Sequence, residues 1–195
     1  MEKESALKWL TLFNELIQTN KGQLNDLDTP IGDGDHGSNM SRGMLAVMEA
    51  LETKEVADGA AVFKTASMQL LAKVGGASGP LYWSAFAGIA KNLTNGATLV
   101  DSLQAGLDEI KKRGKSDVGE KTMIDAWQPL IHLLQENVAL TEETINQIVK
   151  ATKEIKATKG RASYLGERSI GHIDPGAYSS GLFFKALLES GVMNQ

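Results

Sequence analysis

Apolar residues recur along this chain at the three- and four-residue spacing of α-helices, and this spacing constrains the fold more than any other feature. The pattern from Leu7 to Ile17, for example, would place its apolar side chains on one face of a helix. Sustained alternation at period two, which is typical of strands, is absent from the sequence. We therefore expect an all-α protein. The helical patterns lie at residues 7–17, 40–51, 62–71, 81–93, 103–110, 123–134, 145–155 and 182–188.

Local signals mark where several of these helices begin and end. Pro80 stands where the first turn of a helix tolerates proline, and Gly114 is a candidate C-cap. Thr141, followed by two glutamates, predicts a helix start, because a hydroxyl caps free backbone N–H groups and acidic residues suit the positive end of the helix dipole. No linker rich in Pro, Ser or Gly divides the chain, and no repeat has a fixed period. We therefore expect one domain of about eight helices that spans residues 1–195.

Composition excludes several classes of function. The chain has 24 acidic and 20 basic residues and a formal net charge of −4, whereas dedicated nucleic-acid binders usually carry a basic excess. It contains no cysteine, so disulfides and thiolate chemistry are excluded. The sequence shows no signal peptide and no long apolar run. We therefore expect no nucleic-acid partner, no membrane partner and a cytoplasmic location.

Three aspartates, Asp28, Asp33 and Asp35, fall within eight residues, among glycines and ahead of a helical pattern. Close carboxylates repel each other unless a cation neutralises them, and Mg²⁺ is typically held by a few carboxylates while waters and phosphates complete its shell. A turn that caps the next helix could use Asp35 alone, but this leaves the convergence of the other two unexplained. A calcium EF-hand starting at Asp33 is excluded, because its sixth and twelfth positions are Ser38 and Met44. The cluster therefore predicts a magnesium site.

A second segment, Val-Gly-Gly-Ala-Ser-Gly-Pro at 74–80, consists of small residues that lead into a helix. Backbone N–H groups at such a helix start can bind phosphate oxygens, although a tight turn between two helices explains the segment equally well. No lysine follows these glycines, which excludes a P-loop. A similar run at 114–122 is also excluded, because Glu120 interrupts its Gly-Lys-Thr ending.

The third segment, residues 159–176, has too many glycines and charges for a core helix and shows no periodicity. Its length favours a functional loop or lid. Arg161 and Arg168 within it could bind phosphates or form surface pairs with Glu167, and we favour a surface pair for Arg168 only.

Four motifs in this order resemble those of the nucleotide-binding L subunits of dihydroxyacetone kinase, the DhaL family. They are Gly-Asp-Gly-Asp-His-Gly at 32–37, Val-Gly-Gly-Ala-Ser-Gly-Pro at 74–80, Glu-Lys-Thr-Met at 120–123 and the run at 159–176. The resemblance extends over essentially the whole chain. It implies a barrel of eight antiparallel helices with a site for ADP and Mg²⁺ at one rim.

The resemblance also implies which residues form the site. Asp28, Asp33 and Asp35 would hold two Mg²⁺ ions that bridge the diphosphate, and no residue would form a covalent intermediate. His36 could in principle carry a phosphoryl group, but the neighbouring carboxylates and metal favour a role in contacting phosphate or orienting a ligand. The positions implied to bind the nucleotide are His36, Ser38, Asn39, Gly76, Ala77, Ser78, Gly114, Thr122, Met123, Arg161, Asp174, Pro175 and Gly176.

For stand-alone L subunits of bacterial kinases, the resemblance implies that bound ADP is a coenzyme. A phosphohistidine on a DhaM-type carrier phosphorylates it to ATP, and the γ-phosphoryl group passes to dihydroxyacetone on a DhaK-type subunit. The lack of a fused K domain in this sequence favours that version. Two alternatives stay open: an ATP-dependent kinase subunit that exchanges its nucleotide, and a nucleotide-loaded module that regulates transcription through a protein partner.

Overall fold

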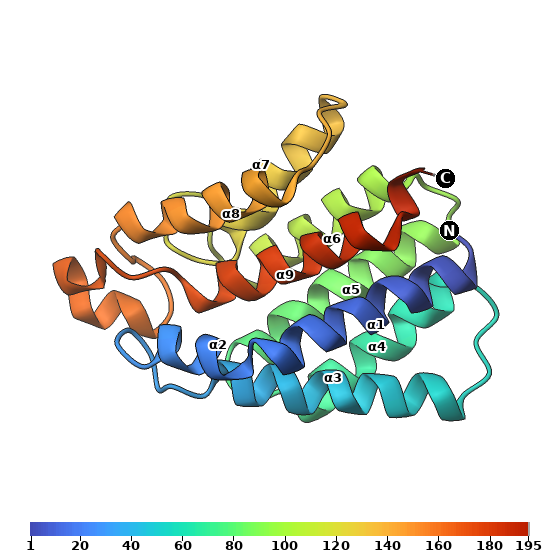
Figure 1. Ribbon diagram of the computed structural model, residues 1–195, viewed down its shortest axis with the longest axis horizontal. Coiled ribbons are helices and arrows are strands. Elements are labelled where there is room, and N and C mark those ends of the chain that lie inside the picture. Colours follow the sequence, from blue (N-terminus) through green and yellow to red (C-terminus); the bar gives the residue numbers. More distant parts are fainter. Residues whose placement is uncertain (195) are drawn as a thin grey trace.

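The computed structural model describes residues 1–194, and within them the predicted all-helical fold is confirmed, with no strand (Figure 1). The α-helices are α1 (Lys3–Thr19), α2 (Lys21–Asp28), α3 (His36–Thr53), α4 (Gly59–Lys73), α5 (Ser78–Thr94), α6 (Leu99–Gly114), α7 (Ile124–Gln135), α8 (Glu142–Ala151) and α9 (Pro175–Ser190), and the 3₁₀ segments are η1 (Thr152–Glu154), η2 (Arg161–Ser169) and η3 (Val192–Asn194).

From α2 onward the helices run alternately up and down the molecule (Figure 1). One end therefore gathers the N-termini of α3, α5, α7 and α9 together with the C-termini of α2, α4, α6 and α8. Both chain termini lie at the opposite end (Figure 1). As a result, the connections that contain the glycine-rich motifs lie at the same end of the molecule.

One continuous core contains buried side chains from all nine α-helices of the described residues. Its centre is Phe183 of α9, whose ring stacks on Trp9 with a centroid distance of 4.5 Å and on Trp127 with a centroid distance of 5.3 Å. The indole N–H of Trp9 also donates to the carbonyl of Phe183 at 3.0 Å, which satisfies the polar end of a fully buried side chain. Among the described residues no helix combines the length and the apolar character that crossing a bilayer requires.

Two helices differ from the predicted pattern. Helix α2 was not predicted, because its eight residues bury only Leu24 and Asp28 and so show no apolar periodicity. Helix α8 ends at Ala151, whereas the pattern through Ile155 predicted a longer helix. The chain instead tightens into η1 after Ala151, and Ile155 is extended. The helix prediction at this end was therefore wrong by one turn.

The helix-boundary signals are confirmed with one small correction. The hydroxyl of Thr141 accepts the N–H of Thr144 at 3.1 Å at the start of α8, and Pro80 lies in the first turn of α5. Gly114 is the last residue of α6, and the left-handed residue that ends the helix is Lys115, with φ 47°.

Candidate nucleotide and metal site

A pocket opens where the N-termini of α3, α5, α7 and α9 meet. His36, Ser78 and Pro175, the first residues of three of these helices, line it, as does Met123, which directly precedes α7. A helix N-terminus offers unpaired N–H groups and a partial positive charge. The pocket therefore suits a ligand that carries several negative charges.

Most of the residues implied by the resemblance line this pocket, although they come from five separate stretches of the chain. The implied residues found there are Asp28, Asp33, Asp35, His36, Gly76, Ala77, Ser78, Thr122, Met123, Arg161, Asp174, Pro175 and Gly176.

Three of the implied residues, Ser38, Asn39 and Gly114, do not line the pocket. Ser38 is bonded to Asn25 of α2, whose side chain accepts the Ser38 N–H at 3.0 Å and donates to its hydroxyl at 3.0 Å. Asn39 is buried, and its Oδ1 accepts from Nη2 of Arg42 at 2.6 Å. Gly114 ends α6. Nucleotide binding by these three residues stays a prediction.

The three aspartates converge as predicted: carboxylate oxygens of Asp28, Asp33 and Asp35 lie within 4.8 Å of one another. Asp28, the last residue of α2, is buried, and its Oδ2 accepts the N–H groups of Asp35 at 3.0 Å and His36 at 3.2 Å. These bonds fold the loop back over the carboxylate. Gly32 permits this close approach, because a Cβ there would lie 2.0 Å from Oδ1 of Asp28.

The electrostatics of the cluster favour a cation. Burial raises the pKa of Asp28 above its ordinary value, and the charges of Asp33 and Asp35 raise it further, while the two backbone N–H groups oppose this rise. The guanidinium of Arg161 forms an ion pair with Asp33. A divalent cation would relieve the remaining repulsion, and an all-oxygen donor set of this kind suits Mg²⁺.

A buried polar network lies beneath the pocket. The Nε2 atom of His36 is hydrogen-bonded to Oγ of Ser179 at 2.9 Å, and the hydroxyl of Tyr82 is bonded to the same oxygen at 2.8 Å. Burial lowers the pKa of His36 to about 4 and raises the pKa of Tyr82 to about 12, so both side chains are uncharged near neutral pH. A buried, neutral imidazole with one nitrogen already bonded suits an orienting role better than phosphoryl transfer.

Asp174 lines the pocket and also caps the N-terminus of α9. Its carboxylate accepts the N–H of Ala177 at 2.7 Å and so caps α9. Burial raises the pKa of Asp174 to about 7, although the nearby charge of Lys121 lowers it. The carboxyl group of Asp174 is therefore partly protonated near neutral pH.

The opposite pKa shifts of His36 and Asp174 predict opposite effects of pH on stability. Between pH 6.5 and 4 the unfolded chain protonates His36 before the folded chain does, so this residue removes stability as the pH falls. The folded chain protonates Asp174 first, between pH 7 and 3.8, so that residue adds stability as the pH falls. In urea unfolding with EDTA present, Asp174→Asn should therefore lose stability on acidification more steeply than the wild type, by up to ~1.4 kcal/mol per pH unit. His36→Gln should show the opposite change, and parallel curves for all three proteins would contradict the assignment.

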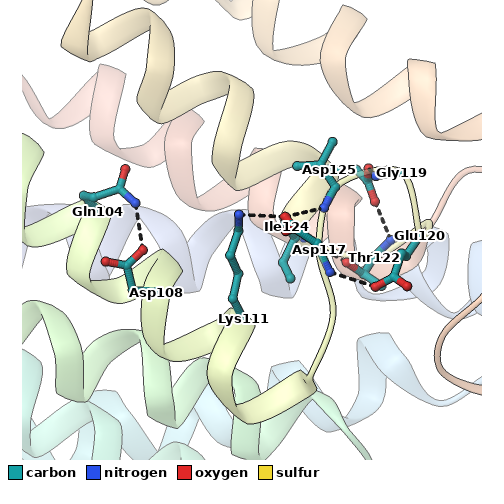
Figure 2. A network of polar contacts seen from close by, with 10 residues as sticks. Gln104, Asp108, Lys111, Asp117, Gly119, Glu120, Thr122, Ile124 and Asp125 are labelled. Atoms are coloured by element: carbon teal, nitrogen blue, oxygen red, sulfur yellow. Dashed lines mark hydrogen bonds and ion pairs between the residues drawn. The ribbon is translucent and has the colours of Figure 1, made fainter.

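The connection from α6 to α7 presents Thr122 and Met123 to the pocket, and a polar network fixes it (Figure 2). The two carboxylate oxygens of Asp125 accept the N–H groups of Gly119 at 2.6 Å and of Thr122 at 2.8 Å. Lys111 of α6 also forms an ion pair with Asp117 at 2.7 Å. This network was not predictable from the sequence, where its one local sign is the acidic residue Asp125 in the first turn of a predicted helix.

The pocket also contains residues that were not assigned to the site from the sequence. Some belong to the motifs at 32–37 and 159–176, and the others lie just before or after a motif, so position in or near a motif was the signal that could have found them. They are Ile31, Gly32, Leu81, Tyr82, Lys159, Gly160 and Ala162.

Comparisons with known proteins show the family of this chain. A family model described as the DAK2 domain matches residues 30–189. The ADP-binding subunit DhaL of PEP-dependent dihydroxyacetone kinase 1 from Listeria innocua is 52% identical over 195 residues, with 98% of each chain covered. The ADP-binding subunit DhaL of the PEP-dependent dihydroxyacetone kinase from Escherichia coli is 39% identical, with 92% of each chain covered.

A solved structure gives the same fold. The dihydroxyacetone kinase of C. freundii, crystallised in complex with AMP-PNP and Mg²⁺, superposes with a TM-score of 0.75 at 30% identity over 93% of this chain and 33% of that longer chain. The fold and the family match together define the class of protein as a DAK2 domain. Within that class, the chain belongs to the DhaL family of dihydroxyacetone kinase subunits.

Proposed function

We propose that this chain is the ADP-binding subunit of a PEP-dependent dihydroxyacetone kinase. In this proposal its bound ADP is phosphorylated to ATP by the phosphohistidine of a DhaM-type carrier, and the γ-phosphoryl group passes to dihydroxyacetone on a DhaK-type subunit in the cytoplasm. The observation that carries the proposal is the convergence of three aspartates and several helix N-termini on one pocket. The names of the relatives from Listeria innocua and Escherichia coli support the choice of nucleotide and reaction.

The aspartate cluster is the proposed magnesium site. Asp28, Asp33 and Asp35 would hold two Mg²⁺ ions, since they supply several oxygen ligands within a small space. Magnesium supplies the positive charge that neutralises phosphate oxygens during phosphoryl transfer. The crystal complex of the C. freundii kinase with AMP-PNP and Mg²⁺ supports this assignment.

The segment before α5 is the proposed diphosphate-binding loop. Ala77 stands at the N-cap of α5 and makes no side-chain capping bond, so no side chain competes with a phosphate for the first N–H groups. Gly76 has φ 66°, and a Cβ there would meet only the side-chain nitrogen Nδ2 of Asn39, at 4.0 Å. The backbone can therefore approach the ligand closely at this point.

Arg161 is proposed to bind both the metal site and the phosphate. Its guanidinium has five N–H donors, and the ion pair with Asp33 does not use all of them. Because Arg161 lines the pocket, its remaining donors can reach phosphate oxygens. We propose that it stabilises charge on the group being transferred.

The proposal is tested by asking which phosphoryl donor supports turnover. The purified chain should retain stoichiometric ADP through gel filtration in Mg²⁺ buffer, because metal and helix N-termini both hold the diphosphate. With a DhaK-type subunit and dihydroxyacetone, a phosphorylated DhaM-type carrier should support formation of dihydroxyacetone phosphate, and free ATP should not replace the carrier. Equal turnover with ATP alone, together with rapid loss of ADP on the column, would favour the nucleotide-exchanging kinase instead.

A further inference from the structure

Lys121 is a buried lysine whose ammonium group binds three backbone carbonyls. The side chain is 1% exposed, and Nζ donates to the carbonyls of Thr152 at 2.6 Å and of Ile155 at 3.1 Å, and also to that of His172. Ile155 and His172 directly precede and follow residues 156–171, which we term the lid segment. One ammonium group therefore bonds to both ends of this segment.

The buried position of Lys121 carries a cost that its bonds must offset. Burial of an ammonium group is unfavourable unless its N–H donors are satisfied, and all three acceptors here are uncharged carbonyls. The backbone of Lys121 also has φ 61°, a left-handed conformation that is disfavoured for a side chain of this size. The bonds from Gly119 and Thr122 to Asp125 hold the chain on both sides of it in this conformation.

Helix capping alone accounts for only two of the three bonds. The carbonyls of Thr152 and Ile155 lie at the end of α8 and η1, where a lysine commonly satisfies free acceptors. The carbonyl of His172 belongs instead to the chain that returns from the lid segment toward α9. The third bond therefore joins two parts of the chain that capping would leave separate.

Two further hydrogen bonds join the two ends of the lid segment where they lie side by side, a region that we term the neck. The N–H of Gly171 donates to the carbonyl of Lys153 at 2.8 Å, and the N–H of Ala157 donates to the hydroxyl of Ser169 at 2.9 Å. Ser169 is fully buried. The neck is thus a bonded unit, with the ammonium of Lys121 as its charged member.

Beyond the neck, the lid segment reaches the metal site. Residues 159–162 line the pocket, and Arg161 forms its ion pair with Asp33. Ala157 and Ala162 pack with Ile31 in a small apolar cluster that is separate from the main core. The lid segment therefore connects the neck at Lys121 with the loop that carries the aspartates.

We propose that Lys121 is a positioning residue, which holds the two ends of the lid segment together so that the segment closes on bound nucleotide as one unit. Lys121 does not line the pocket, so it acts on the ligand only through the lid segment. The link to nucleotide retention depends on the proposed function, whereas the role of Lys121 at the neck can be tested without nucleotide.

The test is limited trypsin digestion of Lys121→Met, which keeps the length and apolar stem of the side chain. The lid segment contains Lys156, Lys159, Arg161 and Arg168 as cleavage sites. Without nucleotide, the variant should be cut at these sites about tenfold faster than the wild type, because charge-assisted hydrogen bonds to both ends of the segment are lost. The release of ADP from the Mg²⁺ complex should accelerate about tenfold as well.

Lys112→Met is the matched control, because Lys112 is an exposed lysine near the end of α6, its ammonium lies 4.0 Å from the carboxylate of Glu109, and it takes no part in the neck. It should digest and release ADP like the wild type. Cleavage of Lys121→Met must be confined to the lid segment, since cuts throughout the chain would indicate global unfolding. If Lys121→Met is cut in the lid segment no faster than the control, the proposal is overturned.

Hydrogen exchange of the wild type gives a second test that needs no variant. Without nucleotide, the N–H groups of Gly171 and Ala157 at the neck should exchange at least about tenfold more slowly than that of Arg161. Equal exchange at neck and tip would overturn the proposal even if Lys121→Met does not fold. If the wild type does not bind ADP, the proposed function is refuted. The digestion and hydrogen-exchange experiments without nucleotide would still decide the role of Lys121.

Discussion

Replacing Asp33 with Asn is expected to weaken Mg²⁺-dependent ADP binding about hundredfold, because one anionic ligand is lost where a metal must join protein to diphosphate. The fold should tolerate the change. Asp33 is half-exposed, and its ion pair with Arg161 is also solvent-accessible, so its loss should cost about 1 kcal/mol or less. Isothermal titration of ADP with and without Mg²⁺, together with circular dichroism, measures both effects.

Asp26→Asn is the control for this change, because Asp26 is exposed on α2 and lies outside the metal cluster. It removes the same charge from the same region of the chain, so it should leave ADP binding within about twofold of the wild type. Undiminished binding by Asp33→Asn would refute the metal assignment. Equal losses in both variants would show that general electrostatic attraction, and not ligation, holds the nucleotide.

Replacing Gly37 with Ala is expected to destabilise the protein by about 3 kcal/mol, or roughly 10 °C in melting temperature. A Cβ at Gly37 would lie 2.1 Å from the carbonyl oxygen of Lys21 and 2.9 Å from Cβ of Leu24, so α2 and α3 must separate. Asp28 lies at the end of α2, so a separation of α2 from α3 would displace this proposed metal ligand. Differential scanning calorimetry measures the loss of stability, and ADP titration measures the damage to the site.

Gly22→Ala is the matched control, since Gly22 is an exposed glycine on α2 and a Cβ there would meet no atom within 4 Å. Alanine favours the helix more than glycine does, so this variant should be more stable by up to about 1 kcal/mol. The two substitutions should therefore have opposite signs. A neutral effect at Gly37 would mean that α2 and α3 do not pack as closely as their backbones indicate.

The sequence predicted those parts of the fold that have strong local patterns. Helices with a clear apolar face, such as α1, were found because burial of that face dictates the spacing of their residues. Helix α2 has no such face, and its position is fixed by contacts with α3 and by bonds such as those between Asn25 and Ser38. Contacts of this kind join residues thirteen positions apart and leave no mark on local periodicity.

The predictable part of the site is the part whose charged side chains lie close together in the sequence. The aspartates cluster within one loop, so repulsion among them already indicated a cation. The resemblance also implied nucleotide binding by His36, Ser38 and Asn39, and successive residues of a helix, at about 100° apiece, point to different sides of it. Of these three, His36 lines the pocket, and nucleotide binding by Ser38 and Asn39 stays a prediction. The role of Lys121 was not predictable, since its three acceptors lie more than 30 residues away in sequence.

The position of the chain ends, far from the pocket, has a practical consequence (Figure 1). Met1 and η3 lie at the end of the bundle that is remote from the aspartate cluster, so an affinity tag or surface linkage there leaves the pocket accessible. The protein can thus be immobilised on a sensor chip by its amino terminus, with the nucleotide-binding rim exposed to the flowing solution.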